Sequence, residues 1–152
     1  MDISIIVDKL TTKYPDLLLK ADTTYYWSPN TRTVHYKSPD SSESGAWSLL
    51  HESGHALLGH TNYYSDFELV KLEAEAWKKA QSIEQDFGLT IDEDHIQDCL
   101  DSYRGWLHKR SLCPDCRLSG IQTNASSYTC IFCHKCWEVS SDRFCRPYRK
   151  RR

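Results

Sequence analysis

The amino-acid sequence predicts an α+β fold in which a mainly helical domain with a small β-hairpin or sheet precedes a cysteine-rich appendage. Three observations support this prediction. Apolar residues recur at helical spacing in four segments, two runs of strand-forming residues flank a proline turn, and six cysteines lie between residues 113 and 145. We expect a main domain over residues 1–110, a cysteine-rich segment over 111–140 and a basic tail over 141–152.

The first elements of the main domain are short. Residues 2–12 predict an amphipathic helix, because their apolar residues share one helical face and Pro15 follows. The runs Tyr25–Trp27 and Thr33–Tyr36 are rich in strand formers, and Pro29 stands at the second position of the turn between them. This arrangement predicts a β-hairpin.

Three longer helices are expected after the hairpin. The first runs from about Ala46 to Leu58, with Gly59 as its C-terminal cap. The second begins at a capping box, Ser65–Glu68, and continues to Phe87. The third begins at a similar capping pattern over residues 90–93. It turns four residues inward: Ile96, Leu100, Tyr103 and Leu107.

Charge is distributed unevenly along a chain of ordinary globular composition, 39% hydrophobic and 26% charged. Residues 1–102 hold 8 Lys and Arg against 18 Asp and Glu, a balance of −10, whereas residues 103–152 hold 11 against 3, a balance of +8. No apolar run approaches the roughly 20 residues that span a bilayer, and residues 1–4 lack the features of a secretory signal. We therefore expect a cytoplasmic protein with no membrane partner.

The segment His51-Glu52-Ser53-Gly54-His55 lies in an otherwise apolar helix. Helical residues four apart share one face, so His51 and His55 can each place a ring nitrogen on one metal ion. Glu52 is rotated by one position and can instead take a proton from a water molecule on an open metal position. Burying such a polar cluster without a role would be costly. The segment therefore predicts a catalytic Zn²⁺ with Glu52 as the catalytic base.

A catalytic zinc ion needs a third protein ligand. His60 follows the predicted end of the helix and is expected to point elsewhere. In the next helix, Glu73 lies on the inward stripe with the small residue Ala76, whereas Glu75 lies among lysines. Periodicity therefore selects Glu73 as the third ligand and leaves Glu75 as a solvated residue, or at most one that supports a ligand.

Two Cys-x-x-Cys pairs separated by thirteen residues predict a second, structural Zn²⁺ in a zinc ribbon over residues 111–140. Disulfide bonds are the less favoured alternative, because the sequence shows no secretory signal. The preferred ligands are Cys113, Cys116, Cys130 and Cys133. Cys136, His134 and Cys145 remain alternative ligands.

The tail over residues 141–152 suggests a partner with phosphate groups. Residues 143–152 contain six basic residues and no acidic one, with Phe144 and Tyr148 among them. Such a stretch attracts phosphate backbones, and its aromatic rings can stack on bases. We expect any nucleic-acid contact to be nonspecific. The alternative is a solvated tail that neutralises the acidic main domain.

The motifs of the main domain resemble those of the ImmA/IrrE-type metallopeptidases in the gluzincin group. The likeness rests on His51–His60, on Glu73–Ala80 and on the hairpin from Trp27 to Tyr36, and it covers about residues 20–85. Trp77 and Lys79 depart from the usual family pattern. The resemblance implies a minimal gluzincin-like metallopeptidase domain that acts in the cytoplasm of a bacterium or phage-infected cell. Several members of that family cleave a partner transcriptional repressor.

We therefore expect a zinc-dependent endopeptidase that hydrolyses a specific intracellular protein, such as a DNA-bound regulator or repressor. Strand Thr33–Tyr36 would align the extended substrate by β-addition. The alternative is a nucleic-acid- or protein-binding zinc module with no catalytic activity, against which the intact Glu52 argues. Residue type alone offers four candidates for stabilising the oxyanion: His35, Tyr63, Tyr64 and Tyr103.

Overall fold

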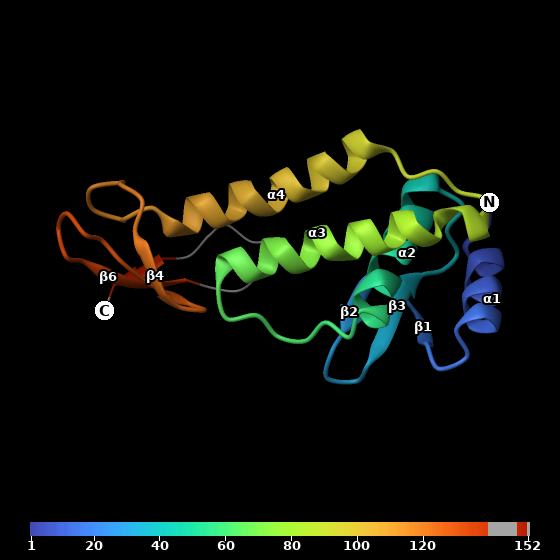
Figure 1. Ribbon diagram of the computed structural model, residues 1–152. Coiled ribbons are helices and arrows are strands. Elements are labelled where there is room, and N and C mark those ends of the chain that lie inside the picture. The colour runs from blue at the N-terminus through green and yellow to red at the C-terminus, as the bar shows by residue number, and fades with distance from the viewer. Residues whose placement is uncertain (140–148, 152) are drawn as a thin grey trace. The chain divides into compact units, whose positions relative to one another are not determined.

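The computed structural model describes residues 1–139 and 149–151 (Figure 1). Within them the chain is α+β, with four α-helices and two small sheets, as the sequence predicted at this coarse level. The chain forms two compact units. Unit 1 comprises residues 1–62 and 72–96, and unit 2 comprises residues 63–71 and 97–152.

Helix α1 (Ile3–Lys13) agrees with the predicted amphipathic helix. Asp2 caps it, because its carboxylate accepts the Ser4 backbone N–H at 2.8 Å. Its buried face consists of Ile3, Ile6 and Leu10. The other buried apolar side chains of unit 1 come mainly from residues 33–37, 43–57, 76–83 and 87.

Three strands form the sheet of unit 1: β1 (Leu18–Asp22), β2 (Tyr26–Ser28) and β3 (Thr33–Lys37). The predicted hairpin is confirmed, since β2 and β3 pair antiparallel. Strand β1 was not predicted, and it pairs parallel to β3, so that β3 lies between the other two (Figure 1). The expectation that Thr33–Tyr36 accepts a substrate strand is therefore wrong, because both sides of β3 are already paired. The edge strands of this sheet are β1 and β2.

Helix α2 (Glu43–Leu57) begins three residues earlier than expected. The cause is Ser42, whose hydroxyl accepts the Gly45 N–H at 3.0 Å and so caps the helix. The helix ends at Leu57, one residue before the predicted Leu58, and Gly59 adopts the left-handed conformation of the predicted cap, with φ of 67°.

Helix α3 (Asp66–Ile83) is followed by the 3₁₀ turn η1 (Glu84–Phe87), which together correspond to the predicted second long helix. The Ser65 hydroxyl accepts the Glu68 N–H at 3.1 Å, which is one half of the predicted capping box. Among the described residues, none of the helices combines the length and apolar character that crossing a membrane requires.

Helix α4 (Glu93–Ser111) begins later than the pattern at residues 90–93 suggested. Asp92 caps it, since its carboxylate accepts the Asp94 N–H at 3.1 Å. Of the four residues predicted to face inward, Ile96, Leu100 and Leu107 are buried and Tyr103 is half-buried.

The sheet of unit 2 is antiparallel, with the strand order β4-β5-β6-β7. Its strands are β4 (Ile121–Asn124), β5 (Ser127–Thr129), β6 (Cys136–Val139) and β7 (Arg149–Arg151). Apart from the backbone of β7, the predicted basic tail lies outside the described residues. We call residues 111–139 the ribbon.

A buried arginine, not anticipated from the sequence, organises unit 2. Arg110 is only 1% exposed. Its guanidinium donates to Asp66 Oδ1 at 3.0 Å, to the Ala125 carbonyl at 2.9 Å and to the Tyr128 hydroxyl at 3.1 Å. The Tyr128 hydroxyl also donates to Asp66. A buried guanidinium is tolerated only with such partners, so these contacts join the start of α3, the end of α4 and the ribbon.

Candidate metal centres

Helices α2 and α3 bring together the three residues predicted to hold the catalytic metal: His51, His55 and Glu73. His51 Nε2 lies 2.9 Å from Glu73 Oε2 and 3.2 Å from His55 Nε2, and His55 Nε2 lies 3.3 Å from Glu73 Oε1. All three residues are buried. A tetrahedral ion with bonds of about 2.0–2.1 Å sets its ligand atoms roughly 3.3 Å apart. This group, the His/His/Glu group, could therefore bind a metal ion.

Close packing of the two helices sets the spacing of these donors. A Cβ atom added to Gly54 would lie 2.6 Å from the Ala76 carbonyl oxygen, so α2 approaches the backbone of α3 directly at this glycine. Trp77 stacks on the His51 ring with a centroid separation of 4.2 Å. Gly54 is therefore the residue whose small size lets the two helices come close, and Ala76 on the inward stripe is where α2 meets the backbone of α3.

Glu52 lies beside the group without joining it. Its Oε1 is 4.0 Å from His51 Nε2, and the backbone N–H of Trp27 in β2 favours the ionised form of its carboxylate. Burial raises the pKa of Glu52 above its usual value, although the nearby histidines and the Trp27 N–H oppose this effect. A carboxylate with a raised pKa, held next to a metal-binding group, has the properties of a general base.

Charges within the group balance one another. Burial alone would raise the pKa of Glu73, but hydrogen bonds from His51 and His55 hold that pKa far below its usual range. Burial alone would lower the pKa of His55, whereas Glu73 and Glu52 raise it above the usual value. Glu73 is therefore ionised, which is the state in which a carboxylate binds a cation.

A contact behind His55 was not expected from the sequence. His60 Nδ1 lies 2.8 Å from His55 Nδ1, and His60 Nε2 lies 3.1 Å from Glu75 Oε2. His60 stays out of the His/His/Glu group, but it does not simply point elsewhere, because its ring contacts a member of that group. Burial lowers the pKa of His60. The sequence signal for this contact was Gly59, whose left-handed conformation turns the chain back onto the helix.

His35, one of the oxyanion candidates, faces away from the group. Adjacent side chains of a strand point to opposite faces, and Val34 pairs with Trp27, whose indole N–H donates to the His60 carbonyl at 2.8 Å. His35 instead bonds Asp22 at 3.0 Å on the other face of the sheet. The other candidates, Tyr63, Tyr64 and Tyr103, belong to unit 2.

Comparisons of the chain with protein-family models, with curated proteins and with solved structures gave no match. The resemblance to ImmA/IrrE-type metallopeptidases remains an expectation from the motifs.

The four cysteines preferred as ligands of the structural metal also converge, in unit 2, and we call them the four-cysteine group. Cys116 Sγ lies 3.3 Å from Cys130 Sγ and 3.8 Å from Cys133 Sγ, and Cys113 Sγ lies 3.5 Å from Cys133 Sγ. These distances exceed a disulfide bond of about 2.05 Å. A tetrahedral ion with Zn–S bonds of about 2.3 Å sets sulfur atoms roughly 3.8 Å apart. The four-cysteine group could therefore bind a metal ion.

The alternative ligands lie apart from the four-cysteine group or outside the described residues. Cys136 Sγ contacts the Thr129 hydroxyl at 3.4 Å. His134 adopts a left-handed conformation and donates its backbone N–H to the Cys130 carbonyl at 3.0 Å, so it shapes the turn after the second cysteine pair. Cys145 lies outside the described residues. Neither Cys136 nor His134 belongs to the cluster of donor atoms.

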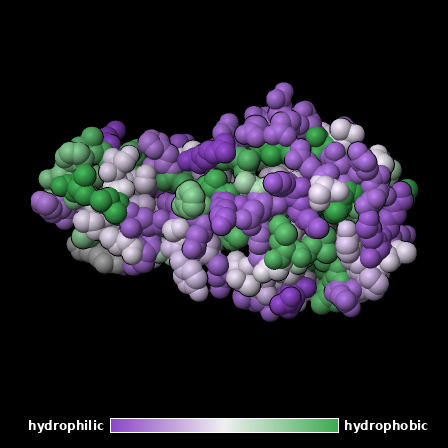
Figure 2. Space-filling model, in the orientation of Figure 1, coloured by the Kyte–Doolittle hydropathy of each residue, from purple (hydrophilic) through white to green (hydrophobic). Residues whose placement is uncertain are grey.

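Apolar side chains of the ribbon remain at its surface. Leu118, Ile121, Ile131 and Phe132 are exposed, and Phe132 reaches 63%. Figure 2 shows hydrophobic surface over the turns of the ribbon, above the place where Figure 1 labels β4 and β6. The buried cluster of the ribbon consists of Tyr128, Trp137 and Val139 with Cys113 and Cys130. So small a core favours a fold that depends on metal.

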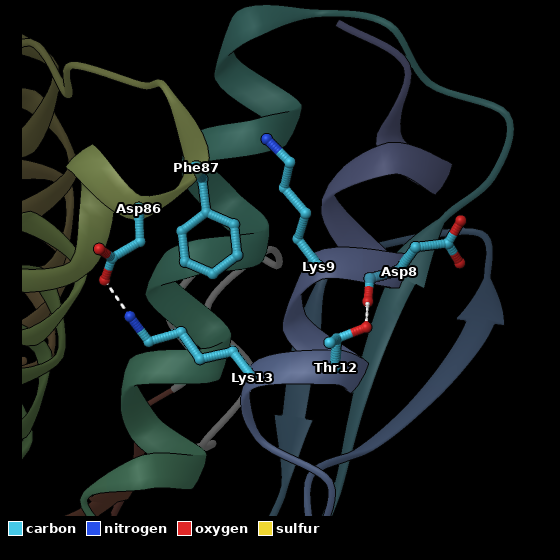
Figure 3. A pocket seen from close by; sticks show the side chains of 6 residues that line it. All are labelled: Asp8, Lys9, Thr12, Lys13, Asp86 and Phe87. Carbon is cyan, nitrogen blue, oxygen red and sulfur yellow. Dashed lines mark hydrogen bonds and ion pairs between the residues drawn. The ribbon is translucent and has the colours of Figure 1, made fainter.

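A surface pocket of about 380 Å³ lies between α1 and η1, with Lys9 and Thr12 on one side and Phe87 on the other (Figure 3). Lys13 and Asp86 form an ion pair at its wall. No member of the His/His/Glu group lines it, and the pocket plays no part in the candidate centre.

Proposed function

We propose that the protein is a zinc-dependent endopeptidase with a minimal gluzincin-like domain, similar to the ImmA/IrrE-type enzymes. His51, His55 and Glu73 would hold the catalytic Zn²⁺, and the four-cysteine group a structural one. The observation that carries this proposal is Glu52, a carboxylate held beside a group of three metal-binding side chains.

The two donor sets suit different roles. Structural zinc sites use four protein ligands, whereas catalytic sites use three and keep a position for water or substrate. Two imidazoles and a carboxylate match the second type, and four thiolates match the first. When bound in the His/His/Glu group, zinc would lower the pKa of a water molecule and polarise the substrate carbonyl.

Glu52 would take the proton from that water and pass it to the leaving amine. The backbone N–H of Trp27 in β2 stabilises the ionised form of its carboxylate. Since Trp27 belongs to β2, an edge strand of the sheet, β2 rather than β3 is the strand beside which an extended peptide could lie. Burial of the carboxylate matches the environment in which a glutamate acts as a base near neutral pH.

The substrate we propose is an intracellular protein, such as a DNA-bound regulator or repressor. The motif resemblance supports this class, and the excess of basic residues after residue 102 is suited to a partner near nucleic acid. The competing hypothesis is a binding module in which both metal ions are structural. This hypothesis assigns no function to Glu52, so the effect of replacing Glu52 distinguishes it from the peptidase hypothesis.

The test compares the parent protein with Glu52→Gln, which removes the base and keeps nearly the same side-chain volume. Each is incubated with a library of peptides from a digested proteome, and newly formed amino termini are identified by mass spectrometry. We expect cleavages by the parent that fall by about 10²–10⁴-fold or more in the variant. Glu43→Gln, an exposed change in the first turn of the same helix, is the matched control and should cleave like the parent.

Elemental analysis must show that Glu52→Gln keeps the metal content of the parent, so that a loss of cleavage reports the base alone. Cleavage by the variant at the parental rate would contradict the peptidase proposal. So would a parent preparation that holds its metal and generates no new termini from the proteome library or from proteins of its own cell.

A further inference from the structure

The end of α2 turns His60 back onto His55. The Gly59 N–H donates to the Ala56 carbonyl at 3.1 Å, and the His60 N–H donates to the His55 carbonyl at 3.0 Å. With φ of 67° at Gly59, this pair of bonds is the Schellman motif, which brings the second residue after the helix against the third residue from its end. In this chain both residues are histidines.

Donor and acceptor can be assigned in each hydrogen bond of the series that links Glu75, His60 and His55. An ionised carboxylate only accepts, so His60 Nε2, 3.1 Å from Glu75 Oε2, carries a proton. In the neutral imidazole, His60 Nδ1 is then an acceptor, and His55 Nδ1, 2.8 Å away, is the donor. In neutral His55, the form that binds a metal ion, Nε2 is then left with its lone pair, and it is this nitrogen that faces His51 and Glu73.

We propose that His60 and Glu75 are positioning residues, which hold His55 in the tautomer and ring orientation that bind the catalytic metal. This inference rests on the metal-binding part of the proposed function. A ligating histidine ordinarily donates its other ring nitrogen to a fixed acceptor, and loss of that acceptor weakens metal binding. Here the acceptor is a second histidine, which is 8% exposed and anchored on its far side by Glu75, whose side chain is 43% exposed.

The other ligating histidine is held differently. His51 Nδ1 is buried and has no hydrogen-bond partner among the described residues, while Trp77 stacks on the face of its ring. His55 therefore depends on hydrogen bonding for its orientation, and His51 on packing. Trp27 strengthens the arrangement around His55, because its indole N–H donates to the His60 carbonyl.

The experiment measures the affinity of the full chain for Co²⁺ and Zn²⁺ in competition with a chelator. Co²⁺ distinguishes the two centres, because thiolate ligands produce intense near-ultraviolet bands that a His/His/Glu group lacks. His60→Leu should weaken binding at the His/His/Glu group by about 10–100-fold. His60→Asn should recover part of that loss, since its amide oxygen can accept the His55 N–H, and Glu75→Gln should lose less than His60→Leu because it keeps an acceptor.

His35→Leu is the matched control, because His35 is also 8% exposed and bonded to a carboxylate, Asp22, yet lies on the other face of the sheet. It should keep the parental affinity. Unchanged affinity in His60→Leu would overturn the inference, and so would equal losses in His60→Leu and His60→Asn, which would indicate packing alone. If His60→Leu fails to fold, Glu75→Ala at the more exposed position decides, with unchanged affinity counting against the inference.

The readout separates this inference from the proposed function. A parent protein that binds no metal at the His/His/Glu group would refute the proposed function itself. A parent that binds metal there, with His60 and Glu75 variants of equal affinity, would refute only the positioning role.

Discussion

The two candidate metal centres have donor atoms at similar spacing, but the surrounding structure differs. The His/His/Glu group lies on two long helices that pack against each other through Gly54 and Ala76. The four-cysteine group lies on two turns next to short strands, with a small buried cluster around Tyr128 and Trp137. Packing of the helices positions the first group, whereas we expect the second group to stabilise the fold of the ribbon by binding a metal ion.

The same contrast extends to chemistry. Four sulfur donors complete a tetrahedral ion, and three donors leave a position for water. A carboxylate that is not a member of the group, Glu52, lies next to the three-donor group. When helix packing holds the ligands in place, three protein ligands are enough to form a centre. The fourth position then stays available for water, which is what a catalytic metal site needs.

The largest effect is expected from removing one thiolate of the four-cysteine group. Structural zinc contributes about 10–16 kcal/mol of folding free energy in small zinc-dependent modules. Cys130→Ser should therefore unfold the ribbon and leave the fold of unit 1 intact. Hydrogen exchange resolved by peptide measures this difference, since amides of β5 and β6 should lose protection and those of α2 should keep it.

Cys136→Ser is the control, because Cys136 contacts Thr129 and stands outside the four-cysteine group. It should leave protection of the ribbon unchanged. Equal loss of protection in the two variants would make Cys136 a ligand, and retained protection in Cys130→Ser would mean that the ribbon folds without its metal.

A smaller effect, confined to one centre, is expected from Glu73→Gln. An uncharged amide is a weaker ligand than a carboxylate, so metal affinity of the His/His/Glu group should fall by more than the roughly 10–100-fold typical of a supporting residue. Elemental analysis after dialysis should find two zinc ions per chain in the parent and one in the variant, with Glu43→Gln again as the control. One ion or fewer in the parent would refute the two-centre model, and two ions in Glu73→Gln would exclude Glu73 as a ligand.

The smallest effect concerns the packing of the helices themselves. In Gly54→Ala the new methyl group would lie 2.6 Å from the Ala76 carbonyl oxygen. Overpacking of this kind costs typically about 1–3 kcal/mol. Chemical denaturation, followed by hydrogen exchange in α2, should show this loss together with weaker metal binding at the His/His/Glu group.

Gly105→Ala should have the opposite effect, because a Cβ added to this helical glycine would meet no atom within 4 Å beyond the adjacent backbone of its own helix. Replacing an unconstrained glycine in a helix stabilises by roughly 0.5–1 kcal/mol. If Gly54→Ala were as stable as Gly105→Ala, the close approach of α2 and α3 would not control the geometry of the centre.

The donors of both centres could be predicted because their signals are local in the sequence. His51 and His55 are one helical turn apart, and Glu73 lies on the inward stripe of a helix with clear periodicity. The Cys-x-x-Cys pairs are equally local. The structure brings each predicted set together, and the identity of the metal and the roles of these residues remain predictions.

Contacts between distant segments could not be predicted in the same way. Strand β1 pairs with β3, although β2 lies between them in the sequence. The burial pattern of β1 does not alternate, so the usual signal of a half-buried strand is absent. This missing strand led to the wrong assignment of β3 as the substrate strand. Arg110 gave no periodic signal either, because its burial depends on Asp66 and on the ribbon.

The contact between His60 and His55 is an intermediate case. Helical geometry does separate residues five apart, but the left-handed glycine at 59 ends the helix and reverses the chain, so helical geometry no longer applies at residue 60. The Schellman pattern, recognised as such, would have indicated which two side chains meet. The contact with Glu75 depends on the approach of α3 and could not be inferred from spacing.

Unit 2 is assembled from two separate stretches of the chain, residues 63–71 and 97–152, and this arrangement limits how the ribbon can be reused. Asp66 comes from the first stretch, and it bonds both Arg110 and Tyr128 from the second. A gene fusion that began at residue 111 would leave Asp66 and Arg110 behind and strip the Tyr128 hydroxyl of both partners. We therefore expect that residues 111–139 alone would not keep their fold in another protein. The start of α3 and the end of α4 would have to be transferred with them.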